Sequence, residues 1–341
     1  MKIHNLNIFI PKSPIDQVFD SRDIDFHSKN QSKLKPENFF NIIKNKNLSE
    51  IRSNWDSSLL NENYNYFKNK TFLIEIKSNE LFYQGILCGI SSRILKKELV
   101  IPHEKVFKKR VDKLKNYLDI VKIQAEPVVF GTSFPKEINT LIKLSSKNKA
   151  ILDFKYKNFN YSIKKLNLID SINNFSKFYI VDGHHRTSSF KSFSKNSKKE
   201  FKLLTFLIDV KNIKTDKYTW EVIKPSRNIV NSLKKLKKSS FKPDSELFWA
   251  IYEDEYYVFD RTDLGKLSII NLEKWIMKFG DKIKRYHDIK NKKYDNSIIF
   301  NYPIFSFNQI IDSINKQGVF PQKSTFLEPK MITGLTISEL V

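Results

Sequence analysis

The sequence has a single cysteine, Cys88, among its 341 residues. One cysteine excludes a framework of internal disulfide bonds, and the apolar run around it, GILCGI, predicts a small core residue rather than a nucleophile. Histidine is also scarce, with six residues, and neither a CxxC nor an HExxH pattern occurs. These absences argue against a transition-metal site.

Long hydrophobic runs are missing as well. The apolar run in the N-terminal stretch MKIHNLNIFIPKSP is too short for a signal sequence, and no other stretch approaches the length of a membrane span. We therefore expect a cytoplasmic protein without a membrane partner. No internal repeat, low-complexity segment or Gly/Ser-rich tether divides the chain, which predicts one continuous fold.

Positive charge is abundant, because 60 Lys and Arg residues stand against 37 Asp and Glu residues, for a net charge of +23. Lysine outnumbers arginine, and Asn and Ile are also frequent, as an AT-rich genome would impose. The lysines are scattered, as at 195–199 and 234–238, and form no single basic arm. Such a field favours an anionic ligand such as ATP as much as DNA. Without a helix-turn-helix pattern, direct nucleic-acid binding is the less favoured interpretation.

Apolar periodicity alternates strands with helices through the middle of the chain. Strands or hairpins are predicted at 7–10, 72–90, 126–132, 178–181, 203–210, 246–260 and 297–302, and helices at 36–43, 107–121, 137–144, 272–279 and 305–316. Two apolar runs, 150–156 and 161–168, fit either type of element. The alternation predicts a mixed α/β domain with one sheet.

The stretch FYIVDGHHRTSSFKSF concentrates the chemistry of the chain. It predicts a buried strand, a tight turn at Asp182 and Gly183, and a helix that begins with two histidines and an arginine. A helix N-terminus attracts phosphate through its backbone N–H groups and its dipole. Gly183 lets the backbone approach a ligand, and His184, His185 and Arg186 add donors. Taken alone, the stretch is a phosphate-binding turn, a surface turn or part of a metal site.

Two more segments carry candidate polar groups. His103 and Glu104 are predicted to stand at the N-terminus of the amphipathic helix that follows them, with Glu104 exposed at the edge of a phosphate site. The helix dipole alone also favours a carboxylate there. Lys323, Ser324 and Thr325 follow a proline turn, and a lysine with two hydroxyls can hold phosphate oxygens or a bound Mg²⁺. The glycine spacing of a Walker A motif is absent.

The motif DGHHR after a buried strand resembles the phosphate-binding signature of the ParB/sulfiredoxin-like superfamily. More specifically, the chain resembles a bacterial and archaeal family catalogued as domain of unknown function 1015. Four segments carry this resemblance, namely KPENFF (35–40), IPHEKVFKKR (101–110), VDGHHRTSSF (181–190) and GVFPQKSTFLEPKMITGL (318–335). The resemblance implies a ParB/sulfiredoxin-like nucleotide-binding core at 71–215, preceded by an N-terminal module at 1–70. A C-terminal elaboration at 216–341 would close on the site.

The part of the chain with HE and DGHHR is similar to the free-serine kinases of that superfamily, and this similarity implies an activity. The chain would transfer a phosphoryl group from ATP or ADP, with Mg²⁺, to a small hydroxyl compound such as free L-serine. Residues 183–187 and 323–325 would bind phosphates, and Asp182 would bind Mg²⁺ or orient the turn. Glu104 would accept the hydroxyl proton, and His103 would orient substrate, bind phosphate or cap. Arg227, near a proline, would contact phosphate or substrate.

Two positions depart from the family pattern. Thr187 stands beside the DGHHR arginine, where an aromatic residue is usual, and Gln322 stands where a proline is common. These departures leave phosphate binding intact, so Thr187 stays among the expected phosphate-binding residues. They put the identity of the phosphoryl acceptor in question. Two other functions fit the same motifs, a ParB-like nucleotide-gated DNA-binding protein and a non-catalytic nucleotide or metabolite sensor.

Overall fold

The computed structural model describes residues 1–21, 34–97, 99–168, 175–265, 268–287 and 296–340. The chain forms two compact units. Unit 1 comprises Met1–Pro102, Val106–Ile213 and Pro329–Val341, and unit 2 comprises His103–Lys105 and Lys214–Glu328. Three residues of unit 2 thus interrupt unit 1. The functional division of the sequence at 70/71 and 215/216 stays a prediction.

Unit 1 is built on a mixed nine-stranded sheet with the order β4-β9-β6-β10-β3-β2-β8-β7, and β1 pairs with β2. Strand β6 runs parallel to β10 and antiparallel to β9. A separate short pair, β5 with β19, joins the C-terminal segment to this unit. The strands are β1 (Leu6–Pro11), β2 (Tyr64–Lys77), β3 (Phe82–Ser91), β4 (Val100–Ile101), β5 (Ile123–Gln124), β6 (Val128–Thr132), β7 (Ala150–Tyr156), β8 (Phe159–Leu166), β9 (Phe178–Asp182), β10 (Lys202–Asp209) and β19 (Ser338–Glu339).

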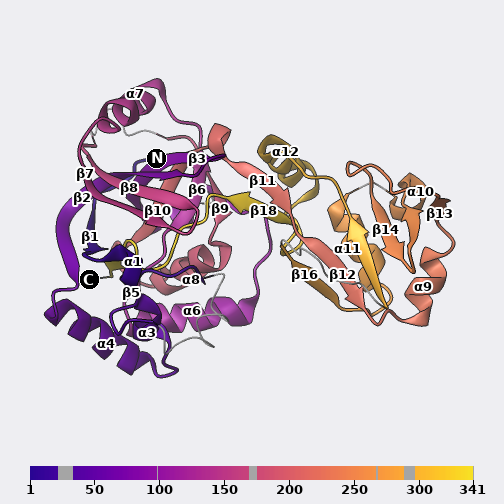
Figure 1. The fold of residues 1–341 in the computed structure, drawn as a ribbon, viewed down its shortest axis with the longest axis horizontal. Helices are drawn as coiled ribbons and strands as arrows, with labels where there is room; N and C mark the ends of the chain where they lie inside the picture. The colour runs from indigo at the N-terminus through magenta and orange to yellow at the C-terminus, as the bar shows by residue number, and fades with distance from the viewer. Residues whose placement is uncertain (22–33, 98, 169–174, 266–267, 288–295, 341) are drawn as a thin grey trace. The chain divides into compact units, whose positions relative to one another are not determined.

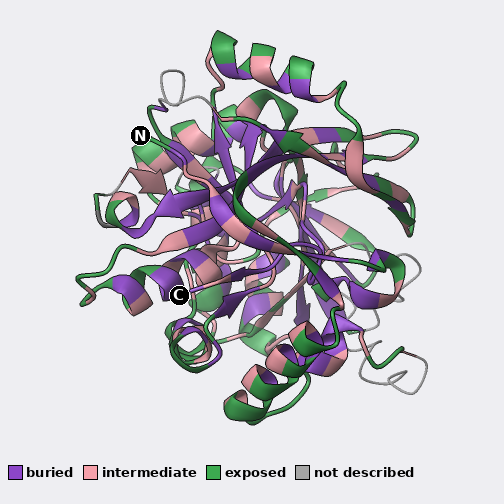
Figure 2. Cartoon of the chain, turned by 90° about the vertical axis from the view of Figure 1, so that its left-hand side faces the viewer, coloured by how far each residue is buried: buried purple, intermediate pink, exposed green. Residues whose placement is uncertain are grey.

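The helices of unit 1 pack their apolar sides inward, and Figure 1 shows α6 and α8 side by side, with α3 and α4 close to α6. They are α1 (Pro14–Gln17), α3 (Phe39–Ile43), α4 (Leu48–Leu60), α5 (Ser92–Lys96), α6 (Lys108–Ile120), α7 (Lys136–Ser145), α8 (His184–Ser194) and the 3₁₀ turn η4 (Val210–Asn212). Strands in the interior of this unit are mostly buried, while the helices expose one side (Figure 2). Cys88 is fully buried in β3, which confirms the predicted core residue.

Two hydrophobic clusters make up the core of unit 1. One cluster includes Phe130, Phe178 and Phe190 and joins the sheet to α6, α7 and α8. The other includes Phe39 and Trp55 and lies among α3, α4 and β5. The motif helix α8 is therefore anchored by its apolar side, which fixes its first turn against the sheet.

Unit 2 contains an antiparallel six-stranded sheet with the order β13-β15-β14-β17-β12-β16, and a second sheet that pairs β11 with β18. Its strands are β11 (Lys214–Lys217), β12 (Thr219–Ile223), β13 (Lys237–Ser239), β14 (Trp249–Tyr252), β15 (Glu255–Val258), β16 (Ile283–Tyr286), β17 (Ser297–Asn301) and β18 (Thr325–Glu328). Its helices are α9 (Arg227–Leu233), α10 (Arg261–Leu264), α11 (Ile269–Met277) and α12 (Phe307–Gln317).

The mixed α/β class is confirmed, and the two ambiguous runs are strands, because β7 and β8 pair as a hairpin. The prediction of one sheet is wrong, because the described strands form a nine-stranded sheet, a six-stranded sheet and two separate pairs. None of the helices in the described part of the chain has both the length and the apolar character needed to cross a bilayer.

The predicted placement of His103 and Glu104 at the N-terminus of α6 is wrong. The helix begins at Lys108, so His103 and Glu104 do not stand in its first turn. Instead the backbone N–H of Phe320 donates to the carbonyl oxygen of His103 at 2.8 Å, and that of Lys105 donates to the carbonyl oxygen of Phe320 at 3.1 Å. This long-range pairing occupies backbone groups that a longer helix would need. Phe107, the first residue of the predicted helix, is 56% exposed.

Candidate functional site

The turn between β9 and α8 requires a glycine. Gly183 is the N-cap of α8 and has a φ of 93°, in the left-handed region. A Cβ atom at this position would lie 2.8 Å from Cγ1 of Val128 in β6, so an alanine would be strained in its backbone and too close to its neighbour. Because glycine offers no side chain, α8 begins without a side-chain cap. The first turn thus keeps the features that make a helix N-terminus receptive to anions.

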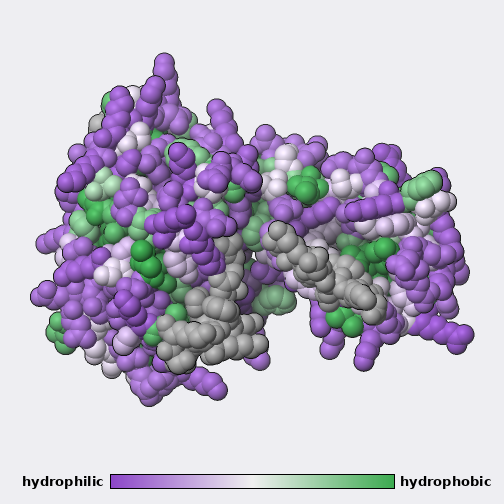
Figure 3. Space-filling model, in the orientation of Figure 1, coloured by the Kyte–Doolittle hydropathy of each residue, from purple (hydrophilic) through white to green (hydrophobic). Residues whose placement is uncertain are grey.

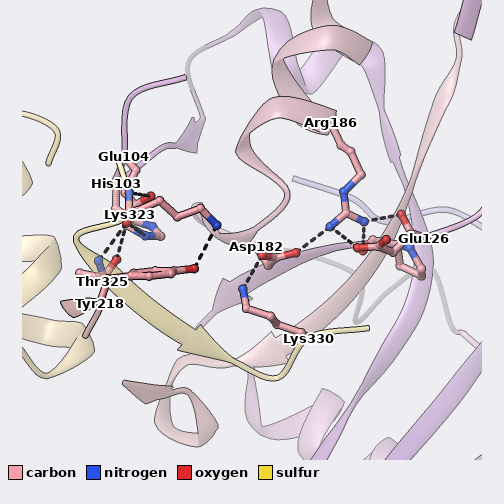
Figure 4. A network of polar contacts seen from close by, with 10 residues as sticks. His103, Glu104, Glu126, Asp182, Arg186, Tyr218, Lys323, Thr325 and Lys330 are labelled. Carbon is pink, nitrogen blue, oxygen red and sulfur yellow. Dashed lines mark hydrogen bonds and ion pairs between the residues drawn. The ribbon is translucent and has the colours of Figure 1, made fainter. Parts of the chain in front are cut away.

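Arg186 in this turn binds the protein on several sides (Figure 4). One guanidinium nitrogen, Nη1, donates to the carbonyl oxygens of Glu126 at 2.7 Å and Pro127 at 3.0 Å. The other, Nη2, lies 2.6 Å from Oδ2 of Asp182 and 2.7 Å from Oε1 of Glu126. Arg186 therefore fastens α8 to the end of β9 and to the segment that precedes β6.

The C-terminal segment of unit 1 contacts both carboxylates that bind Arg186. Lys330 Nζ donates to Oδ1 of Asp182 at 2.6 Å, and the hydroxyl of Thr333 donates to Oε2 of Glu126 at 2.7 Å. Burial alone would raise the pKa of Asp182, but the positive charges of Lys330 and Arg186 lower it well below its ordinary value. Asp182 is therefore a carboxylate with a cation on each oxygen.

Asp182 does not fit the role of a Mg²⁺ ligand in this arrangement. Both of its oxygens already bind cationic side chains, and Mg²⁺ sites in proteins need oxygen ligands that can face the ion. No group of three or more His, Cys, Asp or Glu residues within the described ranges could hold a metal ion. The contacts favour the other predicted role of Asp182, which is to orient the turn.

The two histidines and Thr187 occupy different environments. His184 and His185 are both half-buried. Nε2 of His185 accepts the backbone N–H of Phe107 at 3.0 Å, and the two rings stack with their centroids 6.0 Å apart. Thr187 is buried, and its hydroxyl has no hydrogen-bond partner in the described part of the chain. An unsatisfied buried hydroxyl one turn into α8 is a feature that core packing does not explain.

In unit 2 the residues 323–325 hold the carboxylate of Glu104 (Figure 4). The backbone N–H of Lys323 donates to Oε2 at 3.0 Å. Oε1 accepts the backbone N–H groups of Ser324 at 3.1 Å and Thr325 at 3.0 Å, and also the hydroxyl of Thr325 at 3.0 Å. Three successive N–H groups that converge on one anion form a nest. The loop expected to bind phosphate therefore binds the protein's own carboxylate here.

Buried aromatic side chains shape this nest. Nε1 of Trp220 donates to the carbonyl oxygen of Lys323 at 2.9 Å, and the hydroxyl of Tyr302 lies 3.0 Å from the carbonyl oxygen of Ser324. Lys323 itself has a φ of 54°. With the carbonyl groups bound on one side, the N–H groups face Glu104.

Two further predicted residues also lie in unit 2. His103 is buried, with Nε2 4.0 Å from Oε1 of Glu104. Arg227 is exposed at the first position of α9, which Ser226 caps. The structure thus brings His103 and Glu104 together with residues 323–325, and it brings residues 182–187 together in unit 1.

A family model described as a protein of unknown function, DUF1015, matches residues 25–213, which is more than half of the chain. The chain belongs to the DUF1015 family. Three solved structures are similar to it at 14% sequence identity. SbnI with a C-terminal truncation from Staphylococcus aureus has a TM-score of 0.47 over 71% of this chain and 82% of its own. A free serine kinase in complex with AMP has a TM-score of 0.43 over 72% of this chain and 90% of its own. A conserved hypothetical protein from Pyrococcus furiosus has a TM-score of 0.41 over 72% of this chain and 94% of its own. No curated protein matches the sequence.

Sequence reasoning missed three residues of the network in this DUF1015 protein. Lys330 and Thr333 lie within the family-like segment at 318–335, so membership of that segment was the available signal. Glu126 is the first residue of a predicted strand and carried no signal of its own. In each case the partner is at least 60 residues away in sequence, so no local pattern points to it.

Proposed function

We propose that this protein is a nucleotide-dependent phosphotransferase that acts on a small hydroxyl compound, with free L-serine as the leading candidate. The observation that carries the proposal is the β9–α8 turn. Gly183 in the left-handed region and an α8 start without a side-chain cap supply the backbone of a phosphate site, and His184 and His185 add donors. The resemblance of DGHHR to the superfamily motif supports the proposal that the phosphate belongs to a nucleotide, ATP or ADP with Mg²⁺.

In the proposed reaction the acceptor's hydroxyl oxygen forms a bond to the terminal phosphorus of the nucleotide. The bond from that phosphorus to its bridging oxygen breaks, the shortened nucleotide leaves, and the hydroxyl proton passes to Glu104. Phosphoryl transfer through a loose transition state demands positioning and charge stabilisation more than a strong base. Four donors hold the carboxylate of Glu104 in one place, which supports this role.

Other residues have proposed supporting roles. Asp182 and Arg186 hold the phosphate turn in shape, while Thr187 offers a hydroxyl one turn further along α8. Residues 323–325 orient Glu104, and His103 lies beside it. Arg227 stays a proposed contact to phosphate or substrate, on the resemblance alone.

Phosphorus NMR tests the proposal. The protein is incubated with Mg²⁺, ATP or ADP, and a mixture of free amino acids, with and without L-serine. We expect a new phosphomonoester resonance that requires serine. Glu104→Gln should lose this product but keep its affinity for ATP, because its side chain has no charge to take up the proton.

Glu137→Gln serves as the matched control, since Glu137 is an exposed carboxylate in the first turn of α7. It should form product as the wild type does. If ATP binds but no amino acid or other hydroxyl compound is phosphorylated, the enzyme proposal is wrong and the sensor interpretation replaces it. If neither nucleotide binds, the phosphate site itself is wrong.

A further inference from the structure

A large cavity in unit 1 lies beside the β9–α8 turn. It measures about 1450 Å³ and is lined by α3, α6, α8 and the segment around β5. Arg186 from the motif and Phe107 from the start of α6 both line it. Since Phe107 also stacks on His185, the cavity adjoins the first turn of α8. Its volume is ample for a nucleotide.

The charges on α6 are divided between two sides of the helix. Lys108 and Lys115 form ion pairs with Asp112 and Asp119, which lie four residues further along. The remaining cations of α6, Lys109, Arg110 and Lys113, line the cavity, and none of them has an ion pair with a described residue.

Two more cations, Lys44 and Lys46, line the cavity from the segment after α3. The one carboxylate among the described lining residues, Glu126, already binds Arg186 and Thr333. The lining therefore has an excess of positive charge that complements an anion.

Two aromatic residues at α6 line the cavity, Phe107 directly before the helix and Tyr117 within it. Phe107, the N-cap residue of α6, is 56% exposed. Burial raises the pKa of Tyr117, so its hydroxyl stays protonated and can donate. An exposed aromatic face, a protonated hydroxyl and several cations suit a ligand with an aromatic ring and phosphates.

We propose that this cavity binds the nucleoside part of the nucleotide, with the base against Phe107 and the phosphates between the first turn of α8 and the cationic side of α6. The proposal rests on the proposed function and extends it, because it names α6 as the helix that selects a nucleotide over a simple phosphate. Neither Phe107 nor the lysines of α6 belong to the DGHHR motif.

Calorimetric titration with ATP, adenosine and inorganic tripolyphosphate separates the two parts of the ligand. Phe107→Ala should weaken ATP and adenosine about ten-fold, as expected for the loss of one stacked base, and leave tripolyphosphate unchanged. Phe107→Trp should keep ATP affinity, because the larger ring still stacks. These variants change an exposed side chain, so the fold should persist.

Lys109→Gln/Lys113→Gln should weaken ATP and tripolyphosphate about five-fold or more at low salt. Lys108→Gln/Lys115→Gln is the matched control, since it removes the same charge from the other side of the same helix, and it should have a clearly smaller effect.

Equal effects of the two lysine pairs, or unchanged ATP affinity in Phe107→Ala, would overturn the cavity proposal. The proposed function survives that result if ATP and tripolyphosphate still bind and Gly183→Ala weakens both. If the wild type binds neither ATP nor tripolyphosphate, the proposed function and this inference are both wrong.

Discussion

Two carboxylates of the candidate sites are held by different chemistry. Asp182 has a cationic side chain on each oxygen, Lys330 and Arg186. Glu104 is held by three backbone N–H groups and one hydroxyl. The ionisation of Asp182 therefore depends on side chains that a substitution can remove, whereas the position of Glu104 depends on the conformation of a loop.

Asp182 should make stability depend on pH in acid solution. Its pKa is lowered in the folded protein, so the ionised form favours folding. This contribution is complete above the ordinary Asp value of 3.8 and is lost as the pH falls from there towards the lower folded pKa. At pH 7 Asp182→Asn should reduce the free energy of unfolding by about 1–3 kcal/mol, and the difference from wild type should shrink below about pH 4. Urea unfolding of both proteins at several pH values measures this difference.

The exposed pair Lys115–Asp119 provides the comparison. Asp119→Asn should change the free energy of unfolding by less than about 1 kcal/mol at pH 7, because exposed ion pairs contribute little. Lys330→Met should remove much of the pH dependence of the unfolding free energy that Asp182 causes, since Asp182 then keeps only one cation. Parallel pH profiles for the wild type and Asp182→Asn would show that Asp182 does not have the assigned pKa shift.

At the scale of single elements, the β9–α8 turn allows a comparison of two glycines. Gly183 and Gly280 both have left-handed backbones, with φ values of 93° and 79°. A Cβ atom at Gly280 would meet no atom within 4 Å, but one at Gly183 would press on Val128. Alanine should cost about 1–2 kcal/mol of unfolding free energy at either position through backbone strain. At Gly183 it should cost about 1–3 kcal/mol more through overpacking.

Thermal or urea unfolding of the two variants measures this difference, and ATP titration gives a second readout. Gly183→Ala should weaken ATP binding, because it moves the first turn of α8, while Gly280→Ala should not. Equal stability losses in the two variants would mean that Val128 yields to the added methyl group. The close approach of the turn to β6 would then contribute nothing to the requirement for glycine at position 183.

Local signals explain why the sequence predicted the start of α8 but misplaced the residues that precede α6. At α8 the glycine, the preceding apolar strand and the following helix pattern lie within one short segment. At α6 the local pattern placed His103 and Glu104 at the N-terminus of the predicted helix. The pairing of residues 103–105 with Phe320 decided otherwise, and that partner lies more than 200 residues away.

At the scale of the whole molecule, the net charge of +23 is spread widely. Hydrophilic residues cover most of the visible face rather than one patch (Figure 3). Several lysines are also neutralised in pairs, such as Lys164 with Glu75 and Lys238 with Glu255. Such a surface favours weak attraction to any polyanion over specific recognition.

We therefore expect only non-specific DNA binding. A labelled 20-base-pair duplex should bind with a dissociation constant weaker than about 1 µM at physiological salt and should dissociate as salt is raised further. Fluorescence anisotropy with two unrelated duplex sequences measures both properties. Tight binding that persists in salt and differs between the sequences would revive the DNA-binding alternative. ATP titrated into the same samples shows whether a nucleotide changes the result.

The sequence by itself determined the mixed α/β class, the buried cysteine and the strand, glycine turn and helix around DGHHR, because each depends on neighbours within a few residues. Only the tertiary structure decided which charges meet. Lys330 reaches Asp182 across 148 residues, and Thr325 reaches Glu104 across 221. The path of the chain through the sheets sets these pairs, and a carboxylate or lysine has the same local pattern whether its partner is water, a ligand or another side chain. The roles of Arg186 and residues 323–325 as protein-binding groups therefore emerged from the fold.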